Sequence, residues 1–248
     1  MASLANGGAQ QNLNAGQIKE YPIEVLPLDI QIRIADILSS FDNKIELNEK
    51  INDNLEQQAF AIFDKYFPDV SIGDNSIGDY IIPKRGKNLL SKDAVCGDVP
   101  VVAGGLEPAT YHNKANTSSP VLTISASGAN SGFVRLWNIP VWSSDSSYID
   151  SSMTSEVYFW YVMLKKRQKE IYDSQTGSAQ PHIYPQHIAV MSVAELKKDN
   201  ILQFTKQVTP LFQMIGSNFK ENRNLANLRD TLLPKLMSGE LDVSDIDL

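Results

Sequence analysis

The fold is decided by the stretch Leu26–Phe67, LPLDIQIRIADILSSFDNKIELNEKINDNLEQQAFAIFDKYF. Its apolar residues recur in alternating steps of four and three over almost five heptads, a spacing typical of a coiled-coil helix. We predict one helix from Asp29 to Phe67, with Asp29 as its N-cap and Pro68 just beyond its end. The predicted seam consists of Ile34, Leu38, Phe41, Ile45, Asn48, Asn52, Leu55, Ala59, Ile62 and Tyr66.

A second helix with the same spacing is predicted from about Asp199 to Met237, followed by Gly239 as a stop signal. Pro210 lies inside this range, so we expect it either to kink the helix or to mark a late start. The predicted seam consists of Phe204, Val208, Leu211, Ile215, Asn218, Asn222, Leu225, Leu232 and Leu236. Two complementary apolar stripes predict that the helices pack against each other as an antiparallel coiled coil.

The two seams repeat each other when 170 is added to each position of the first, so that Asn48 gives Asn218 and Asn52 gives Asn222. Asparagine on a coiled-coil seam sacrifices stability for register, and we assign these four residues that role. The same offset relates the N-terminal phrase GGAQQNLNAGQI, from Gly7, to GSAQPHIYPQHI. We therefore predict a repeated unit of loop, short strand and long helix.

This repeat predicts the organisation of the chain. Residues 1–28 are expected to be the remnant of the end of a preceding globular domain, 29–68 the first spacer helix and 69–195 a complete globular domain. Residues 196–248 are then the second spacer helix and an acidic tail. The globular part is rich in Gly, Ser, Pro and Asn and contains short β-prone runs. These runs begin at Tyr80, Val99, Pro120, Gly132 and Pro140.

A helix is predicted from Ser155, its possible cap, through SEVYFWYVMLKKRQKEIYDS. The fold class is therefore α+β, with one mixed globular domain and two long helices. Within this helix, the basic run Lys165–Lys169 has two open interpretations, DNA backbone contact or an ordinary solvated helix end.

Composition limits the possible functions. The net charge of −7 gives no positive support for nucleic-acid binding, although the block Ser71–Val190 is neutral. A single cysteine, Cys96, excludes an internal disulfide and a zinc site of several thiolates, and the three histidines are too scattered to suggest a metal site. No apolar run approaches the roughly 20 residues that span a bilayer, and no secretory leader is evident. We expect a cytoplasmic protein with no membrane partner.

Three loops carry candidate DNA-binding groups. PKRGKN, from Pro83, clusters cations around a glycine, which favours phosphate contact, and the alternative is a solvated loop. The glycine-rich TISASGANSGFV and the phrase TGSAQPHIYP offer hydroxyl and amide groups, and the alternative is loops with only a structural role. The candidate residues are Lys84, Arg85, Lys87, Asn88, Ser125, Ser127, Asn130, Ser131, Thr176, Ser178, Gln180, His182 and Tyr184.

Catalytic motifs are missing from the sequence. It contains no nucleophile elbow, no HExxH, no phosphate-binding glycine loop and no glycine-rich cofactor loop. We predict a noncatalytic protein without a cofactor of its own.

Several stretches resemble one family. Leu26–Phe67 is similar to the central conserved helix of type I restriction–modification DNA specificity subunits, and LRDTLLPKLMSGEL, from Leu228, to their C-terminal helix ending. GGLEPATYHNKANT and VLTISASGANSGFVRLW resemble the body of a target recognition domain. Full-length members have two such domains, and here most of the first is missing.

The resemblance implies a DNA specificity subunit that reads one half of a bipartite site in double-stranded DNA and docks methyltransferase subunits through its helices. S-adenosylmethionine is then expected on the methyltransferase, restriction subunits can join the assembly, and a second copy of the chain is a further candidate partner. The alternative is a truncated assembly or decoy protein that dimerises and binds methyltransferase without reading DNA. An unrelated enzyme with a coiled-coil arm is a third hypothesis, which the missing catalytic motifs disfavour.

Overall fold

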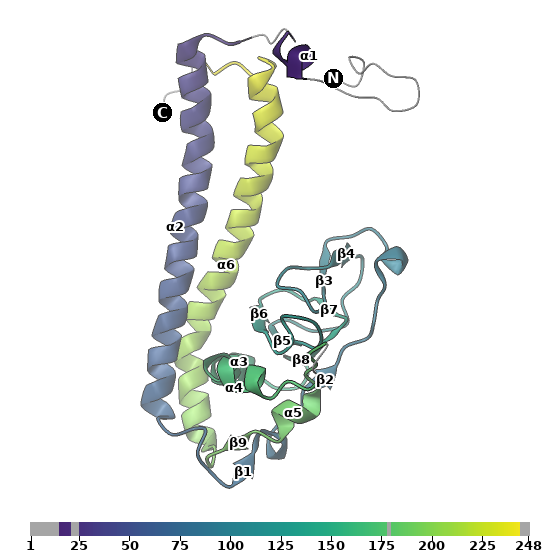
Figure 1. Ribbon diagram of the computed structural model, residues 1–248. Helices are drawn as coiled ribbons and strands as arrows, with labels where there is room; N and C mark the ends of the chain where they lie inside the picture. Colours follow the sequence, from purple (N-terminus) through teal and green to yellow (C-terminus); the bar gives the residue numbers. More distant parts are fainter. Residues whose placement is uncertain (1–14, 21–24, 178–179, 244–248) are drawn as a thin grey trace. The chain divides into compact units, whose positions relative to one another are not determined.

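The computed structural model describes residues 15–20, 25–177 and 180–243. Its largest elements are two long helices, α2 (Leu28–Tyr66) and α6 (Lys198–Met237). The chain divides into a smaller unit, residues 1–45 and 224–248, and a larger unit, residues 46–223, and each helix contributes to both. Within each unit the two helices run side by side in opposite directions, as the two seams predict (Figure 1).

The helix ends correct two details of the sequence prediction. Helix α2 begins at Leu28, so Asp29 lies in its first turn and is not the N-cap. Its negative charge there still suits the partial positive charge of a helix N-terminus. Helix α6 already runs from Lys198 and continues through Pro210, which excludes the late start.

The smaller unit has its own apolar core. Ile34 of α2, Leu236 of α6 and Val243 beyond α6 are buried together. Arg229 of α6 forms an ion pair with Asp42 of α2, with 2.6 Å between Nη1 and Oδ1. This unit also contains the short helix α1 (Ala15–Lys19).

The larger unit is built around a four-stranded antiparallel sheet with the strand order β2-β8-β5-β6. Strand β5 is buried along its whole length, and its Leu122 lies opposite Leu136 of β6 and Ile149 of β8. The strands are β2 (Lys84–Arg85), β8 (Ser146–Asp150), β5 (Val121–Ser125) and β6 (Val134–Trp137).

Two smaller sheets complete the strand content of the described residues. One has the order β4-β3-β7, in which β3 pairs antiparallel with β4 and parallel with β7. The other pairs β1 with β9, at the start and the end of the globular domain. The strands are β3 (Val99–Val102), β4 (Thr110–His112), β7 (Trp142–Ser143), β1 (Asn75–Ser76) and β9 (Ser192–Val193).

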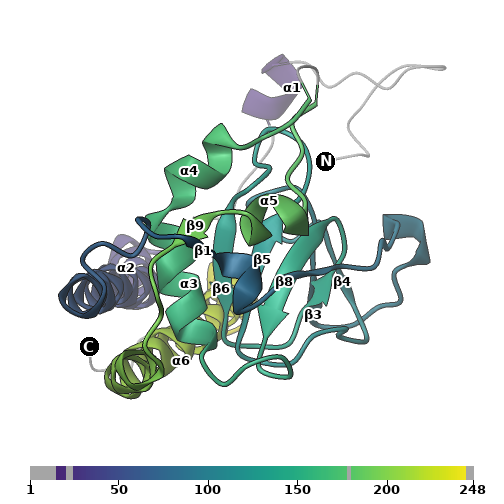
Figure 2. The same cartoon turned by 90° about the horizontal axis from the view of Figure 1, so that it is seen from below.

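Helix α3 (Val157–Lys166) packs the sheet onto the helix pair within the larger unit (Figure 2). Its Phe159 is fully buried, with ring centroids 5.9 Å from Phe63 of α2 and 6.1 Å from Phe204 of α6. Burial of one such aromatic side chain contributes about 1.5–3 kcal/mol. The aromatic cluster therefore fixes the domain on α2 and α6.

Three local predictions for the domain are wrong. The helix predicted from Ser155 is two helices, α3 and α4 (Gln168–Asp173), which meet at Arg167, and Glu156 occupies the cap position of α3. The run at Tyr80 is not a strand, because it follows the 3₁₀ turn Ile77–Asp79. The Tyr80 hydroxyl instead accepts a hydrogen bond from the Leu196 amide at 3.1 Å.

The repeat is also present in the helices. Adding 170 to the bounds of α1 gives those of α5 (Pro185–Ala189), and adding 170 to Leu28, the start of α2, gives Lys198, the start of α6. Strand β9 follows α5, as the predicted unit requires, but the short helix α5 was not predicted. Residues 7–14 of the first copy lie outside the described residues. The mixture of sheets and long antiparallel helices confirms the α+β fold class.

Candidate nucleic-acid interface

The loop after β2 is fastened to the segment that connects β7 and β8. The Gly86 amide donates to the Ser146 carbonyl at 2.8 Å, and the Lys87 amide donates to the Ser143 carbonyl at 2.9 Å. Trp142 donates from Nε1 to the Lys87 carbonyl at 2.8 Å. These bonds hold the loop while its polar side chains stay exposed, namely Lys84, Arg85, Lys87 and Asn88.

Asp145 links this loop to the next one. Its Oδ1 accepts a hydrogen bond from Nη2 of Arg85 at 2.5 Å, and its Oδ2 accepts one from the Ser127 hydroxyl. Both members of the ion pair are partly exposed, with 40% of the Arg85 side chain and 33% of the Asp145 side chain accessible. The carboxylate is therefore held by two loops that the sequence analysis treated separately.

The third loop, 176–184, lies against the second. Ser127 forms a β-bridge with His182, and the Gly128 amide donates to the Pro181 carbonyl at 3.1 Å. Gly177 has a φ of +94°, in the left-handed region that favours glycine, and a Cβ there would lie 2.6 Å from the Gln180 carbonyl oxygen. The tight turn therefore requires glycine at position 177.

The structure thus brings all three predicted loops together in the larger unit. The first and the third loop are about ninety residues apart in the sequence, and Asp145 and Ser127 connect them. The rings of His182 and Tyr184 stack with an interplanar angle of 14° and centroids 5.9 Å apart. Other candidates beside them are exposed or half-buried, namely Asn130, Thr176 and Gln180.

Two of the candidate residues lie inside the domain instead. Ser125 is 3% exposed and donates its hydroxyl to the Ala103 carbonyl, and Ser131 is fully buried. We leave both out of the interface because their side chains do not reach the surface. Ser178 lies outside the described residues.

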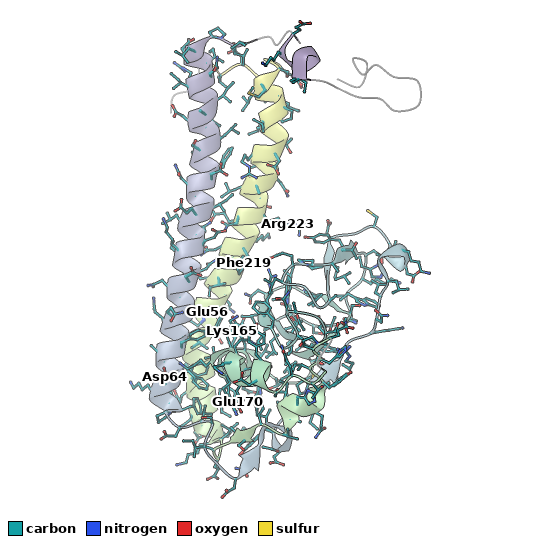
Figure 3. The ribbon with its side chains drawn as sticks, in the orientation of Figure 1. Glu56, Asp64, Lys165, Glu170, Phe219 and Arg223 are labelled. Carbon is teal, nitrogen blue, oxygen red and sulfur yellow. The ribbon has the colours of Figure 1, made fainter. Side chains whose placement is uncertain are left out.

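The basic run at the end of α3 forms its contacts with other parts of the domain and with α2, and not with the three loops. Lys165 lies over the Phe133 ring at 4.6 Å and donates to the Val134 carbonyl at 3.2 Å, and burial lowers the pKa of its ammonium group. Lys166 forms an ion pair with Asp64 of α2 at 2.9 Å. Figure 3 labels Lys165 of α3 and Asp64 of α2. Arg167 is buried against Glu170.

Two residues were not predicted from the sequence: Asp145, which lies in the interface, and Tyr161, which lies between α3 and α2. Asp145 lies in the run SSDSS, whose small polar residues are typical of a turn and give no signal for a binding site. Tyr161 donates its hydroxyl to Glu56 of α2, and burial together with the Glu56 charge raises its pKa well above the usual range. A tyrosine in an apolar helical run gives no sequence signal for such a bond.

The seam asparagines meet across the helix pair in the larger unit. Asn48 donates to Asn222, and Asn218 donates to Asn52, both at 2.8 Å between Nδ2 and Oδ1. Asn48 also donates to Glu221 at 2.8 Å. Asn222 is the repeat copy of Asn52, and Asn218 is the repeat copy of Asn48. Each bond therefore joins an asparagine of one repeat to the copy of the other asparagine of that repeat.

The described residues form neither a metal site nor a membrane-spanning helix. Over residues 15–20, 25–177 and 180–243, no group of three or more His, Cys, Asp or Glu is placed to hold a metal ion. None of the helices described in this structure is long and apolar enough to cross a membrane.

Comparison with known proteins shows which proteins this chain resembles. The model of the type I restriction modification DNA specificity domain matches residues 1–57. The crystal structure of the S subunit of a type I restriction–modification system from Mycoplasma genitalium has a TM-score of 0.61 and 26% identity, over 94% of this chain and 68% of that one. The chain is therefore similar to type I restriction–modification specificity subunits in sequence and in fold.

Curated relatives show the same similarity. The type I restriction enzyme MjaIX specificity subunit of Methanocaldococcus jannaschii is 25% identical over 99% of this chain and 66% of its own length. The type I restriction enzyme HindI specificity subunit of Haemophilus influenzae is 21% identical over 97% and 73%. The chain spans about two thirds of the length of the first of these. Both relatives are specificity subunits, the class of protein that the sequence predicts.

Proposed function

We propose that the globular domain, residues 69–195, is a target recognition domain that binds double-stranded DNA through the three loops and reads one half of a bipartite site. The observation that carries this proposal is the meeting of the three loops on one fastened surface. Lys84 and Lys87 supply the positive charge that phosphates attract, while the hydroxyl, amide and imidazole groups beside them suit base edges.

The helices have a separate part in the proposal. Their seam is occupied by the helix pair itself, whereas apolar side chains outside it, such as Leu47 and Met214, are 50% and 53% exposed. We assign these outer faces to methyltransferase subunits, which carry S-adenosylmethionine, with restriction subunits joining the same assembly in the cytoplasm. A second copy of the chain is a further partner consistent with the repeat.

One observation favours the alternative of an assembly or decoy protein without DNA reading. The chain has a net charge of −7, and the acidic residues of Ser71–Val190 balance the basic ones. A protein that grips DNA through a phosphate-contacting surface usually carries a local basic excess. The two functions differ in whether a complex with methyltransferase protects a duplex.

Selection from a random duplex pool tests the proposal, with the full chain alone and with its methyltransferase. We expect one half-site to be enriched. Lys84→Ala with Lys87→Ala should weaken binding to all duplexes and reduce the salt slope by about 2, since each lost phosphate contact reduces it by about 1. Lys50→Ala on α2 removes an exposed cation elsewhere and is the matched control. Binding to methyltransferase without enrichment of any half-site would establish the decoy function.

A further inference from the structure

We propose that Arg85, held in place by Asp145, is a specificity-determining residue that reads a guanine of the half-site. This inference rests on the proposed DNA binding and names what one side chain does in it. Arginine recognises guanine because its planar guanidinium places two donors opposite O6 and N7 in the major groove. That pairing requires the guanidinium to be exposed, correctly oriented and provided with two free donors.

The geometry around Arg85 meets these requirements. Asp145 receives one hydrogen bond from Nη2, and across the described part of the chain Nε and Nη1 of Arg85 make no hydrogen bond. Guanidinium has five donor hydrogens in a fixed plane, so a carboxylate on one edge leaves the others available. The 40% exposure of the side chain gives them access to solvent.

Asp145 itself is fixed, so it can hold the guanidinium in one plane. Its second oxygen accepts from Ser127, and its backbone carbonyl accepts from the Ala126 amide at 3.1 Å. The chain at Gly86 is fixed as well, because a Cβ there would lie 2.4 Å from the Ser143 carbonyl oxygen. Arg85 therefore loses much of its conformational entropy on folding, and less is lost when DNA binds.

The carboxylate also argues against a simple phosphate contact for Arg85. A negative charge at a DNA-facing surface repels phosphates and cancels part of the attraction that Arg85 would provide. Lys84 and Lys87 have no such carboxylate partner among the described residues. The ion pair of Arg85 with Asp145 lowers affinity for DNA of any sequence and orients the guanidinium donors. Such a pair is suited to reading a base.

The test compares variants on the half-site that the wild-type chain selects together with methyltransferase. Arg85→Ala and Arg85→Lys should each lose preference at one base pair where the wild type requires guanine, by about 5- to 150-fold. Lys87→Ala, the control, should weaken all duplexes equally. Circular dichroism melting of each variant verifies that it is folded.

Asp145→Asn supplies a second, opposite signature. This variant removes the negative charge but keeps an acceptor oxygen of similar size. We expect its affinity for random duplex to rise and its preference for the same guanine to fall. A structural role alone would lower both quantities together through loss of folded protein.

Each contrary outcome has its own meaning. If Arg85→Ala weakened all duplexes by the same factor as Lys87→Ala, or changed preference only where the wild type requires another base, the inference would be overturned and the proposed function would stand. If the wild-type chain selected no half-site even with methyltransferase, both the inference and the proposed function would fail.

Discussion

Asn48 of α2 donates a hydrogen bond to Asn222 of α6, with 2.8 Å between Nδ2 and Oδ1. The equivalent bond in the opposite direction joins Asn218 to Asn52. Since these four residues are two repeated pairs, a local pseudo-two-fold axis passes between them. The bonds fix the register of two helices whose apolar seams alone would permit slippage by a heptad.

Replacing both partners of one bond should therefore separate stability from register. Asn48→Leu with Asn222→Leu removes two polar groups from the seam together, and we expect the melting temperature to rise by several degrees. The same variant should form mixed oligomers, which light scattering would detect. Asn48→Leu alone leaves Asn222 without this partner and should melt lower. A single unchanged species with no gain in stability would contradict the role in register.

Gly216 of α6 gives a second prediction, because a Cβ there would lie 2.7 Å from Cβ of Asn138. Alanine favours a helix by about 1 kcal/mol over glycine, yet overpacking costs about 1–3 kcal/mol. We expect Gly216→Ala to lower the free energy of unfolding measured in urea. The exposed neighbour Ser217→Ala is the control and should be neutral or slightly stabilising. Increased stability of Gly216→Ala would show that Asn138 moves aside freely.

The bond between Tyr161 and Glu56 predicts a pH effect. A hydrogen bond to a charged group contributes about 1.5–3 kcal/mol, so Tyr161→Phe should unfold at lower urea concentration at pH 7. Burial and the Glu56 charge raise the pKa of Tyr161 in the folded state. Its contribution is thus complete below the unfolded pKa of about 10 and is lost as pH rises toward the folded value.

Tyr161→Phe should therefore lose less stability than the wild type between pH 9 and about pH 11. Tyr111→Phe changes an exposed tyrosine and serves as the control. Equal losses in the Tyr161→Phe variant and the wild type would indicate that other groups govern the alkaline transition.

Phe63 supports the attachment of the globular domain to the helices. Its ring is 1% exposed and lies 4.9 Å from the Phe67 ring and 5.4 Å from the Phe204 ring. Phe63→Ala should cost about 3–5 kcal/mol, measured by denaturant unfolding. Phe219→Ala removes a ring that is 55% exposed and should cost far less. Similar losses for both variants would mean that the cluster does not anchor the domain.

The long helices were predictable because their evidence is periodic and spans about forty residues each. Strand β8, Ser146–Asp150, was not predicted, because serines usually indicate a loop. In the fold Ser146 and Ser147 are buried, and Ser146 donates its hydroxyl to the Val102 carbonyl at 3.2 Å. From the sequence alone, a serine whose hydroxyl is hydrogen-bonded inside a sheet cannot be distinguished from a serine in a turn.

In the candidate site, features made by sequence neighbours were predictable, whereas contacts between residues far apart in the sequence were not. The cations of 84–87 were visible in the sequence because they are neighbours. The partner of Arg85 was not, because Asp145 lies sixty residues further along the chain and reaches it only through the pairing of β2 with β8. Ser125 and Ser131 were misplaced because composition alone does not tell which side of a loop faces solvent.

The pairing of β1 with β9 has an evolutionary consequence. Asn75 lies opposite Val193, and the Ala194 amide donates to the Val70 carbonyl at 2.9 Å, so the chain leaves the globular domain beside the point where it began. A different domain with the same distance between its ends could be spliced in at this closure by recombination. The helix pair would then serve as a constant scaffold, and the inserted domain as an exchangeable cassette.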